Sequence, residues 1–135
     1  MSKKLKQIEI PQNSELQVIE SSAFFETLIE SLTIPSKLIN LEDRWCQSTT
    51  ELNHIIINPN NPRYSFFDNK FIIGKSKIEQ DNYDVLVFGV RNIKTALIPS
   101  FIEKIGPYVF DYCKQLKTVD FSADSKLSII EKKCI

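Results

Sequence analysis

The feature that most constrains the fold of this chain is an apolar pattern that returns at nearly constant spacing. Each copy reads L-x-x-I-x-I or a close variant, and its last apolar residue falls at Ile10, Ile34, Ile57, Ile98 and Phe121. Successive copies are 24, 23, 41 and 23 residues apart, so a single insertion interrupts the period after Ile57. One copy cannot bury its own apolar stripe, whereas stacked copies can. The spacing therefore predicts a solenoid.

The pattern within each copy predicts the shape of one turn. Apolar and polar residues alternate at the end of L-x-x-I-x-I, which is typical of a short strand. Pro11, Pro35 and Pro99 follow three of these strands and end their hydrogen-bond ladder. Apolar residues three to five apart then indicate a short helical or 3₁₀ return turn, as at Ile105 and Val109.

A period of about 20 to 29 residues is that of leucine-rich repeats. We therefore expect an α/β repeat solenoid, a right-handed coil of short parallel strands, forming a single domain over residues 1–135. A generic α/β or all-β domain with chance recurrence is the alternative. The insertion, at about residues 58–90, is predicted to be a β-hairpin. It holds two β-prone runs, F-I-I from Phe71 and V-L-V-F from Val85, after the turn-forming sequence N-P-N-N-P.

The segment I-P-S-F-I-E-K-I-G-P-Y-V-F-D-Y-C-K-Q-L, from Ile98 to Leu116, resembles the BspA-like (treponemal type) leucine-rich repeat. That family's unit is similar to I-P-x-x-V-x-x-I-G-x-x-A-F-x-x-C-x-x-L. The match is looser where Trp45-Cys46 and Cys134-Ile135 occupy the Ala-Phe places. The insertion also resembles a hairpin found in such arrays. The resemblance implies a surface antigen or adhesin that binds proteins or host surfaces, and it brings no catalytic residues.

Composition argues against several other classes of protein. Basic and acidic residues number 17 each, whereas a nucleic-acid partner calls for a basic excess. No apolar run approaches the roughly 18 residues of a membrane span. The N-terminus shows no secretory signal, so the default expectation is a cytoplasmic location, although the family resemblance implies the cell surface. Cys46, Cys113 and Cys134 are too widely spaced to suggest a disulfide framework or a zinc site.

We expect binding to occur on the strand face, at positions between the buried ones. Ile56 and Leu97 are apolar there, and the stacking predicts that they lie in adjacent turns beside the insertion. Neighbouring exposed apolar residues can mark a contact surface. His54, Thr95 and Thr33 complete this candidate surface. The alternative is that the inserted hairpin covers Ile56 and Leu97.

The aromatic residues of the insertion form a second candidate surface, represented by Tyr64, Phe66 and Phe67. Several of them are also expected to pack on the solenoid, because a lone hairpin is barely stable in water. His54, the only histidine, has no recognisable nucleophile or orienting partner, and no phosphate-binding motif is present. We therefore expect neither enzymatic activity nor a cofactor or metal.

Neither end of the array shows the polar cap that solenoids need. This suggests self-association through uncapped ends, or a fragment of a longer array. The leading functional hypothesis is a module that binds a protein whose identity the sequence does not give. The alternatives are a structural or fragmentary family member without its own ligand and, less favoured, an enzyme of unrecognised type.

Overall fold

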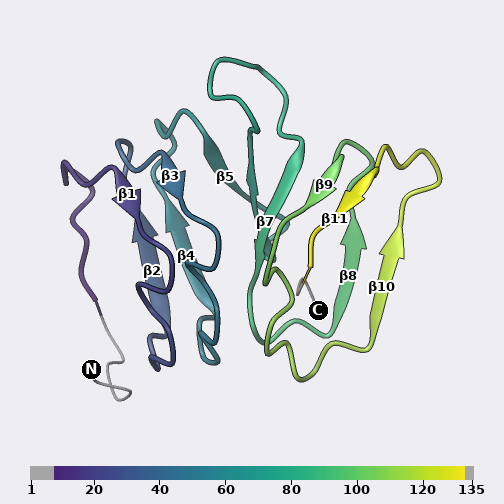
Figure 1. Ribbon diagram of the computed structural model, residues 1–135, viewed down its shortest axis with the longest axis horizontal. Coiled ribbons are helices and arrows are strands. Elements are labelled where there is room, and N and C mark those ends of the chain that lie inside the picture. Colours follow the sequence, from purple (N-terminus) through teal and green to yellow (C-terminus); the bar gives the residue numbers. More distant parts are fainter. Residues whose placement is uncertain (1–7, 133–135) are drawn as a thin grey trace.

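A computed structural model describes residues 8–132 as a β-solenoid of about five turns (Figure 1). The strands are β1 (Val18–Ile19), β2 (Ser31–Ile34), β3 (Asn40–Leu41), β4 (His54–Ile57), β5 (Tyr64–Phe67), β6 (Phe71–Gly74), β7 (Val85–Gly89), β8 (Thr95–Ile98), β9 (Lys104–Ile105), β10 (Thr118–Phe121) and β11 (Ile129–Ile130). Cys134 and Ile135, which the sequence pattern places in the last repeat, lie outside the described residues. The described part of the chain holds no helix long and apolar enough to cross a membrane.

Each regular turn contributes one longer strand and one short strand, and strands of neighbouring turns pair in parallel. In the longer ladder β2 pairs with β4 and β8 with β10, so that Ile34 lies opposite Ile57 and Ile98 opposite Phe121. In the shorter ladder β1 pairs with β3 and β9 with β11. Four of the residues that define the sequence period therefore pair with their equivalents in a neighbouring turn, which confirms the predicted solenoid. The first copy differs, because residues 8–10 form no strand before Pro11.

The core runs between the two ladders. On β2 the side chains alternate, so that Leu32 and Ile34 point inward while Ser31 is exposed. Several aliphatic residues of successive turns are completely buried: Ile29, Ile34, Leu38, Leu52, Ile98 and Ile102. Burying each of these side chains contributes about 1.5–3 kcal/mol to folding. The outer turns are less covered, and the side chains of Phe121 and Ile130 are 47% and 56% exposed.

The return segments differ in detail from the short helices that the apolar spacing suggests, because no helix occurs within residues 8–132. Each segment instead forms consecutive tight turns, as where Phe25 N–H donates to Ser22 O. Residues with positive φ recur four positions apart, at 22 and 26, 44 and 48, and 108 and 112. A right-handed helical run cannot pass through such left-handed residues, so the chain turns repeatedly instead.

The insertion contains the predicted hairpin of β6 and β7 and one further strand, β5, that was not predicted separately. Strands β5, β6 and β7 pair as an antiparallel meander, and β7 continues in parallel to β9 and β11 as one five-stranded sheet. The β5–β6 turn is tight because Asp68 and Asn69 both adopt positive φ, at 58° and 52°. Two such residues match the type I′ turn that suits the twist of a hairpin.

The insertion separates the longer ladder into two halves, and Figure 1 shows β4 and β8 on opposite sides of it. The prediction that Ile56 and Leu97 lie in adjacent turns is therefore wrong. The β5–β6 turn intervenes: Asn69 lines a groove together with Ile56, and Lys70 Nζ donates to Thr95 O at 3.2 Å. The sequence period locates the insertion but does not reveal that its hairpin takes the place of a strand.

Side chains of the insertion bond to backbone groups that the interruption would otherwise leave unpaired. The edge of β3 that faces away from β1 is capped twice: Arg63 Nη1 donates to Ile39 O at 3.0 Å, and Tyr64 Oη accepts from Leu41 N–H at 2.9 Å. Buried Asn61 donates to the backbone oxygens of Pro35 and Leu38, both at 2.8 Å. These bonds fasten the insertion to the turn before it.

Arg91 joins the turns on the two sides of the insertion. The residue is only 3% exposed, and its guanidinium makes six hydrogen bonds, five to backbone carbonyls and one to the Thr49 hydroxyl. Cys46 O and Thr49 O belong to the turn before the insertion, whereas Val109 O belongs to the turn after it. The cation also lies 4.5 Å from the centre of the Phe88 ring. Carbonyl dipoles and an aromatic face together stabilise its buried charge.

We expect Arg91→Met to lower the free energy of unfolding by about 3 kcal/mol or more, because it leaves several buried carbonyls without a donor. Chemical denaturation of the purified chain measures the change. Lys94→Met is the matched control, because it removes a charge at an exposed position on the same segment. Equal denaturation midpoints for the two variants would contradict the role assigned to Arg91.

A second prediction concerns Cys46, whose side chain is fully buried beside Arg91. Burial raises the pKa of its thiol to about 11 from 9.0, although Arg91 acts in the opposite direction. We therefore expect alkylation of Cys46 only after unfolding. The raised pKa also means that this thiol's contribution to stability is complete below pH 9 and is lost as the pH rises toward 11.

Mass spectrometry of the peptide that contains Cys46, after brief treatment with iodoacetamide, gives the measurement. The same treatment of the chain in denaturant is the control. If Cys46 reacts as fast in native buffer as in denaturant, its thiol is not buried in the folded chain.

Candidate functional site

The strand face carries the two exposed apolar residues that the sequence pattern singles out. Ile56 on β4 and Leu97 on β8 are 55% and 57% exposed. The alternative in which the inserted hairpin covers them is therefore wrong. His54 and Thr95 are also exposed, and Thr33 is half-buried opposite Ile56 on β2. Each apolar residue lies in its own half of the ladder, so the face carries two separate exposed apolar positions.

The three aromatic candidates of the insertion have different environments. Tyr64 is 6% exposed and its hydroxyl caps β3, so it does not belong to the exposed surface. Phe66 is half-buried beside Ile56 in a groove. Phe67 is 37% exposed and packs edge-on against Phe101, with ring centres 5.6 Å apart. Phe66 and Phe67 remain candidates for contact with a partner.

A groove of about 600 Å³ lies between β4 and the turn of the inserted hairpin. Its lining residues are Ser31, Asn53, His54, Ile55, Ile56, Phe66, Asn69, Val90 and Asn92. No Asp, Glu, Lys or Arg is among them, although a quarter of the whole chain is charged. Ile56, Phe66 and Val90 supply apolar surface, and three asparagines supply amides.

Sequence reasoning missed the asparagines of this groove and also Val90. The residues are far apart in sequence, and only the folded insertion brings them together. One sequence signal could have indicated the groove. The residue directly before each longer strand is charged in the other turns, as Glu30, Lys94 and Lys117, whereas uncharged Asn53 precedes β4.

A smaller hollow of about 210 Å³ lies on the opposite ladder, between β3 and β7. Its walls include charged residues of both signs, but several are already engaged. Arg63 donates to three backbone carbonyls, and Lys104 forms an ion pair with Glu131 at 3.0 Å. The volume is also below that of ordinary ligand pockets, which begin near 300 Å³. We interpret the hollow as the junction between two sheets.

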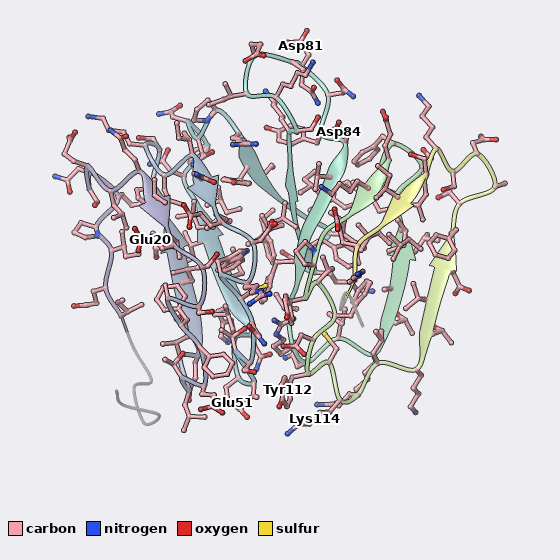
Figure 2. The ribbon with its side chains drawn as sticks, viewed as in Figure 1. Glu20, Glu51, Asp81, Asp84, Tyr112 and Lys114 are labelled. Atoms are coloured by element: carbon pink, nitrogen blue, oxygen red, sulfur yellow. The ribbon has the colours of Figure 1, made fainter. Side chains whose placement is uncertain are left out.

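The remaining ionisable groups do not converge. Figure 2 shows Asp81 and Asp84 at one end of the molecule, and Glu51, Tyr112 and Lys114 at the other. Partial burial acts to raise the pKa of the Asp84 carboxyl, but hydrogen bonds from the Ser76 hydroxyl and N–H outweigh this effect. The pKa is therefore lowered overall. Within residues 8–132, no three His, Cys, Asp or Glu side chains are placed to hold a metal ion.

Three solved structures share this fold over nearly the whole chain. A leucine-rich repeat protein from Eubacterium ventriosum is 19% identical, with a TM-score of 0.77, and covers 94% of this chain. The pneumococcal vaccine antigen PcpA is 22% identical, with a TM-score of 0.79, and covers 93%. A leucine-rich cell surface protein from Faecalibacterium prausnitzii is 21% identical, with a TM-score of 0.66, and covers 94%.

The chain spans about a third of each of these structures, at 32%, 30% and 35% of their lengths. Among curated proteins, none matches it in sequence. The family model of the BspA type leucine rich repeat region, which contains six copies, matches residues 1–85 and 72–135. These two segments together include every residue of the chain. It therefore belongs to the BspA-type leucine-rich-repeat family.

Proposed function

We propose that this chain is a protein-interaction module that binds its partner along the strand face, on both sides of the inserted hairpin. The observation that carries the proposal is the exposure of Ile56 and Leu97 on a face whose other outward residues are polar or small. Exposed aliphatic side chains next to a groove are typical anchors of protein contacts.

The arrangement suits a partner that crosses the insertion. Ile56 anchors the half before it and Leu97 the half after it, with Lys70 of the hairpin turn bonded to Thr95 beside the second anchor. Burial of each aliphatic side chain in a contact contributes up to about 1.5–3 kcal/mol. Phe67, which packs edge-on against Phe101, adds partly exposed aromatic surface.

The comparisons support this proposal at the level of the fold. A solenoid presents an extended face built from equivalent residues of successive turns, and repeat proteins commonly use it for binding. Two of the similar structures are described as a vaccine antigen and a cell surface protein, and both are much longer than this chain. An adhesin-like or antigen-like role at a cell surface is part of the same proposal.

We expect the double variant Ile56→Asp/Leu97→Asp to lose the proteins that the immobilised wild-type chain captures from an extract of its source cells. Each carboxylate replaces an apolar anchor and cannot be buried against a partner without a large desolvation penalty. Quantitative mass spectrometry of the captured proteins measures the loss.

Thr118→Asp is the control for an added carboxylate, because it places one at an exposed position of β10 on the same face. It should capture the same proteins as the wild type. If the double variant also captures the same proteins in the same amounts, the strand face around the insertion is not the binding surface. That result would favour a structural family member without its own ligand.

A further inference from the structure

Backbone hydrogen bonds bring three asparagines together at the groove beside β4. Arg91 N–H donates to Leu52 O at 3.1 Å, and Val90 N–H donates to Lys70 O at 2.9 Å. The segment 90–92 is therefore tied on one side to the residues just before β4 and on the other to the β5–β6 turn. The groove asparagines that directly follow or precede these bonded residues are Asn53, Asn69 and Asn92.

Two of these amides are open to a ligand. Elsewhere an asparagine serves the fold, as where Asn61 donates to two backbone oxygens of an earlier turn. By contrast, the side chains of Asn69 and Asn92 are exposed and form no hydrogen bond within residues 8–132. The Oδ1 atom of Asn53 is buried, so this residue contributes less to the accessible surface. Asn69 and Asn92 thus supply unengaged hydrogen-bonding groups.

Apolar surface lies in the same groove. Ile56 on β4 is 55% exposed, and half-buried Phe66 belongs to β5, which lies beside β4. The lining has no Asp, Glu, Lys or Arg, and His54 is its only residue that can become charged, by protonation. The groove therefore combines an apolar surface with uncharged donors and acceptors.

The segments that carry the two open amides are firmly held. Arg91, next to Asn92, is fixed by the six hydrogen bonds of its guanidinium. The turn that holds Asn69 is closed by the bond from Lys70 N–H to Phe67 O at 3.1 Å. A site that is already formed before binding loses less conformational entropy when a ligand arrives.

We propose that this groove binds an uncharged sugar residue of a glycan. A pyranose ring has a face of C–H groups and a rim of hydroxyls. The C–H face rests on Ile56 and Phe66, while the amides of Asn69 and Asn92 exchange hydrogen bonds with the hydroxyls. Each amide offers two donor hydrogens and an acceptor oxygen, which suits hydroxyls that both donate and accept. The groove volume of about 600 Å³ lies within the range of ligand sites.

The chemistry of the lining favours this class of ligand over two others. An acidic sugar or a charged peptide finds no Lys, Arg, Asp or Glu partner in the groove. An apolar side chain of a protein suits Ile56 and Phe66, but it excludes water from the amides without bonding to them, which is unfavourable. A neutral sugar satisfies both surfaces. The inference adds a carbohydrate ligand to the proposed function and rests on it only through Ile56, which serves both.

The test is an NMR titration of the whole chain with four neutral trisaccharides: maltotriose, cellotriose, mannotriose and N-acetylated chitotriose. We expect at least one of them to shift the side-chain amide signals of Asn69 and Asn92, with a Kd on the order of 1 mM for so open a site. Trigalacturonic acid, whose rings carry carboxylates, is the control ligand and should not shift them. These measurements use the wild-type chain, so they do not depend on the folding of a variant.

Asn69→Gly and Asn92→Ala should each weaken binding of the trisaccharide about fivefold, because each removes one amide from the groove. Glycine suits the positive φ of 52° at position 69, so the first variant keeps the turn. Asn82→Ala is the matched control, since it removes an exposed amide that does not line the groove. It should bind the trisaccharide as the wild type does.

Absence of shifts at Asn69 and Asn92 with all four neutral trisaccharides would overturn the proposal. Equal affinities of the two groove variants and the wild type, or tighter binding of trigalacturonic acid, would also overturn it. Shifts at the same amides with a capped valine–threonine peptide, but with no sugar, would assign the groove to a protein segment instead. The proposed function fails separately, through unchanged protein capture by the Ile56→Asp/Leu97→Asp variant, because the sugar titration needs no protein partner.

Discussion

Backbone hydrogen bonds that pass from one turn to the next are the constraint on which this solenoid depends. They run through parallel strand pairs such as β2–β4 and β8–β10, and each turn contacts only its neighbours. The insertion after Ile57 breaks this chain of bonds in the longer ladder. At the insertion, side chains supply hydrogen bonds in place of strand pairing. Arg91 donates to backbone carbonyls of the turns on both sides of the insertion, and Arg63 and Tyr64 bond to the backbone of β3 and its flank.

The proposed binding surface follows from the same interruption. In an uninterrupted ladder β4 would pair with the next longer strand, and Ile56 would be one of a continuous row of outward residues. The inserted hairpin instead places Asn69 beside Ile56 and creates a groove whose lining has no Asp, Glu, Lys or Arg. The regular turns provide a rigid support, and the insertion provides the local difference that a partner can recognise. The proposed site lies at the irregular part of a regular array, as is common where a rigid scaffold carries a functional insertion.

The repeat architecture could be predicted from sequence because periodic burial is a local property. Each L-x-x-I-x-I copy indicates which residues face inward. Ile34 and Ile98 are buried and paired with the equivalent residue of a neighbouring turn, as the period predicts. The return turns were harder to predict, since positive φ at Ser22, Arg44 and Tyr108 breaks the helical spacing without any glycine to signal it.

The candidate site could be predicted only in part. Exposure of Ile56 and Leu97 follows from strand alternation, but their separation depends on where the hairpin packs. Tyr64 has the sequence context of a surface aromatic, yet its hydroxyl lies against β3. Arg91 is an arginine within an apolar run, and its burial depends on carbonyls from distant turns. Contacts of this kind have no periodic signature.

Native-state hydrogen exchange at increasing denaturant tests most directly whether these side-chain bonds join the array across the insertion. If they do, the protected amides of β2–β4 and those of β8–β10 will begin to exchange at the same free energy, as one cooperative unit. If β8–β10 exchanges at a clearly lower free energy while β2–β4 stays protected, the insertion divides the solenoid into independent halves. That result would contradict the joining role of Arg91 and of the side chains that cap β3.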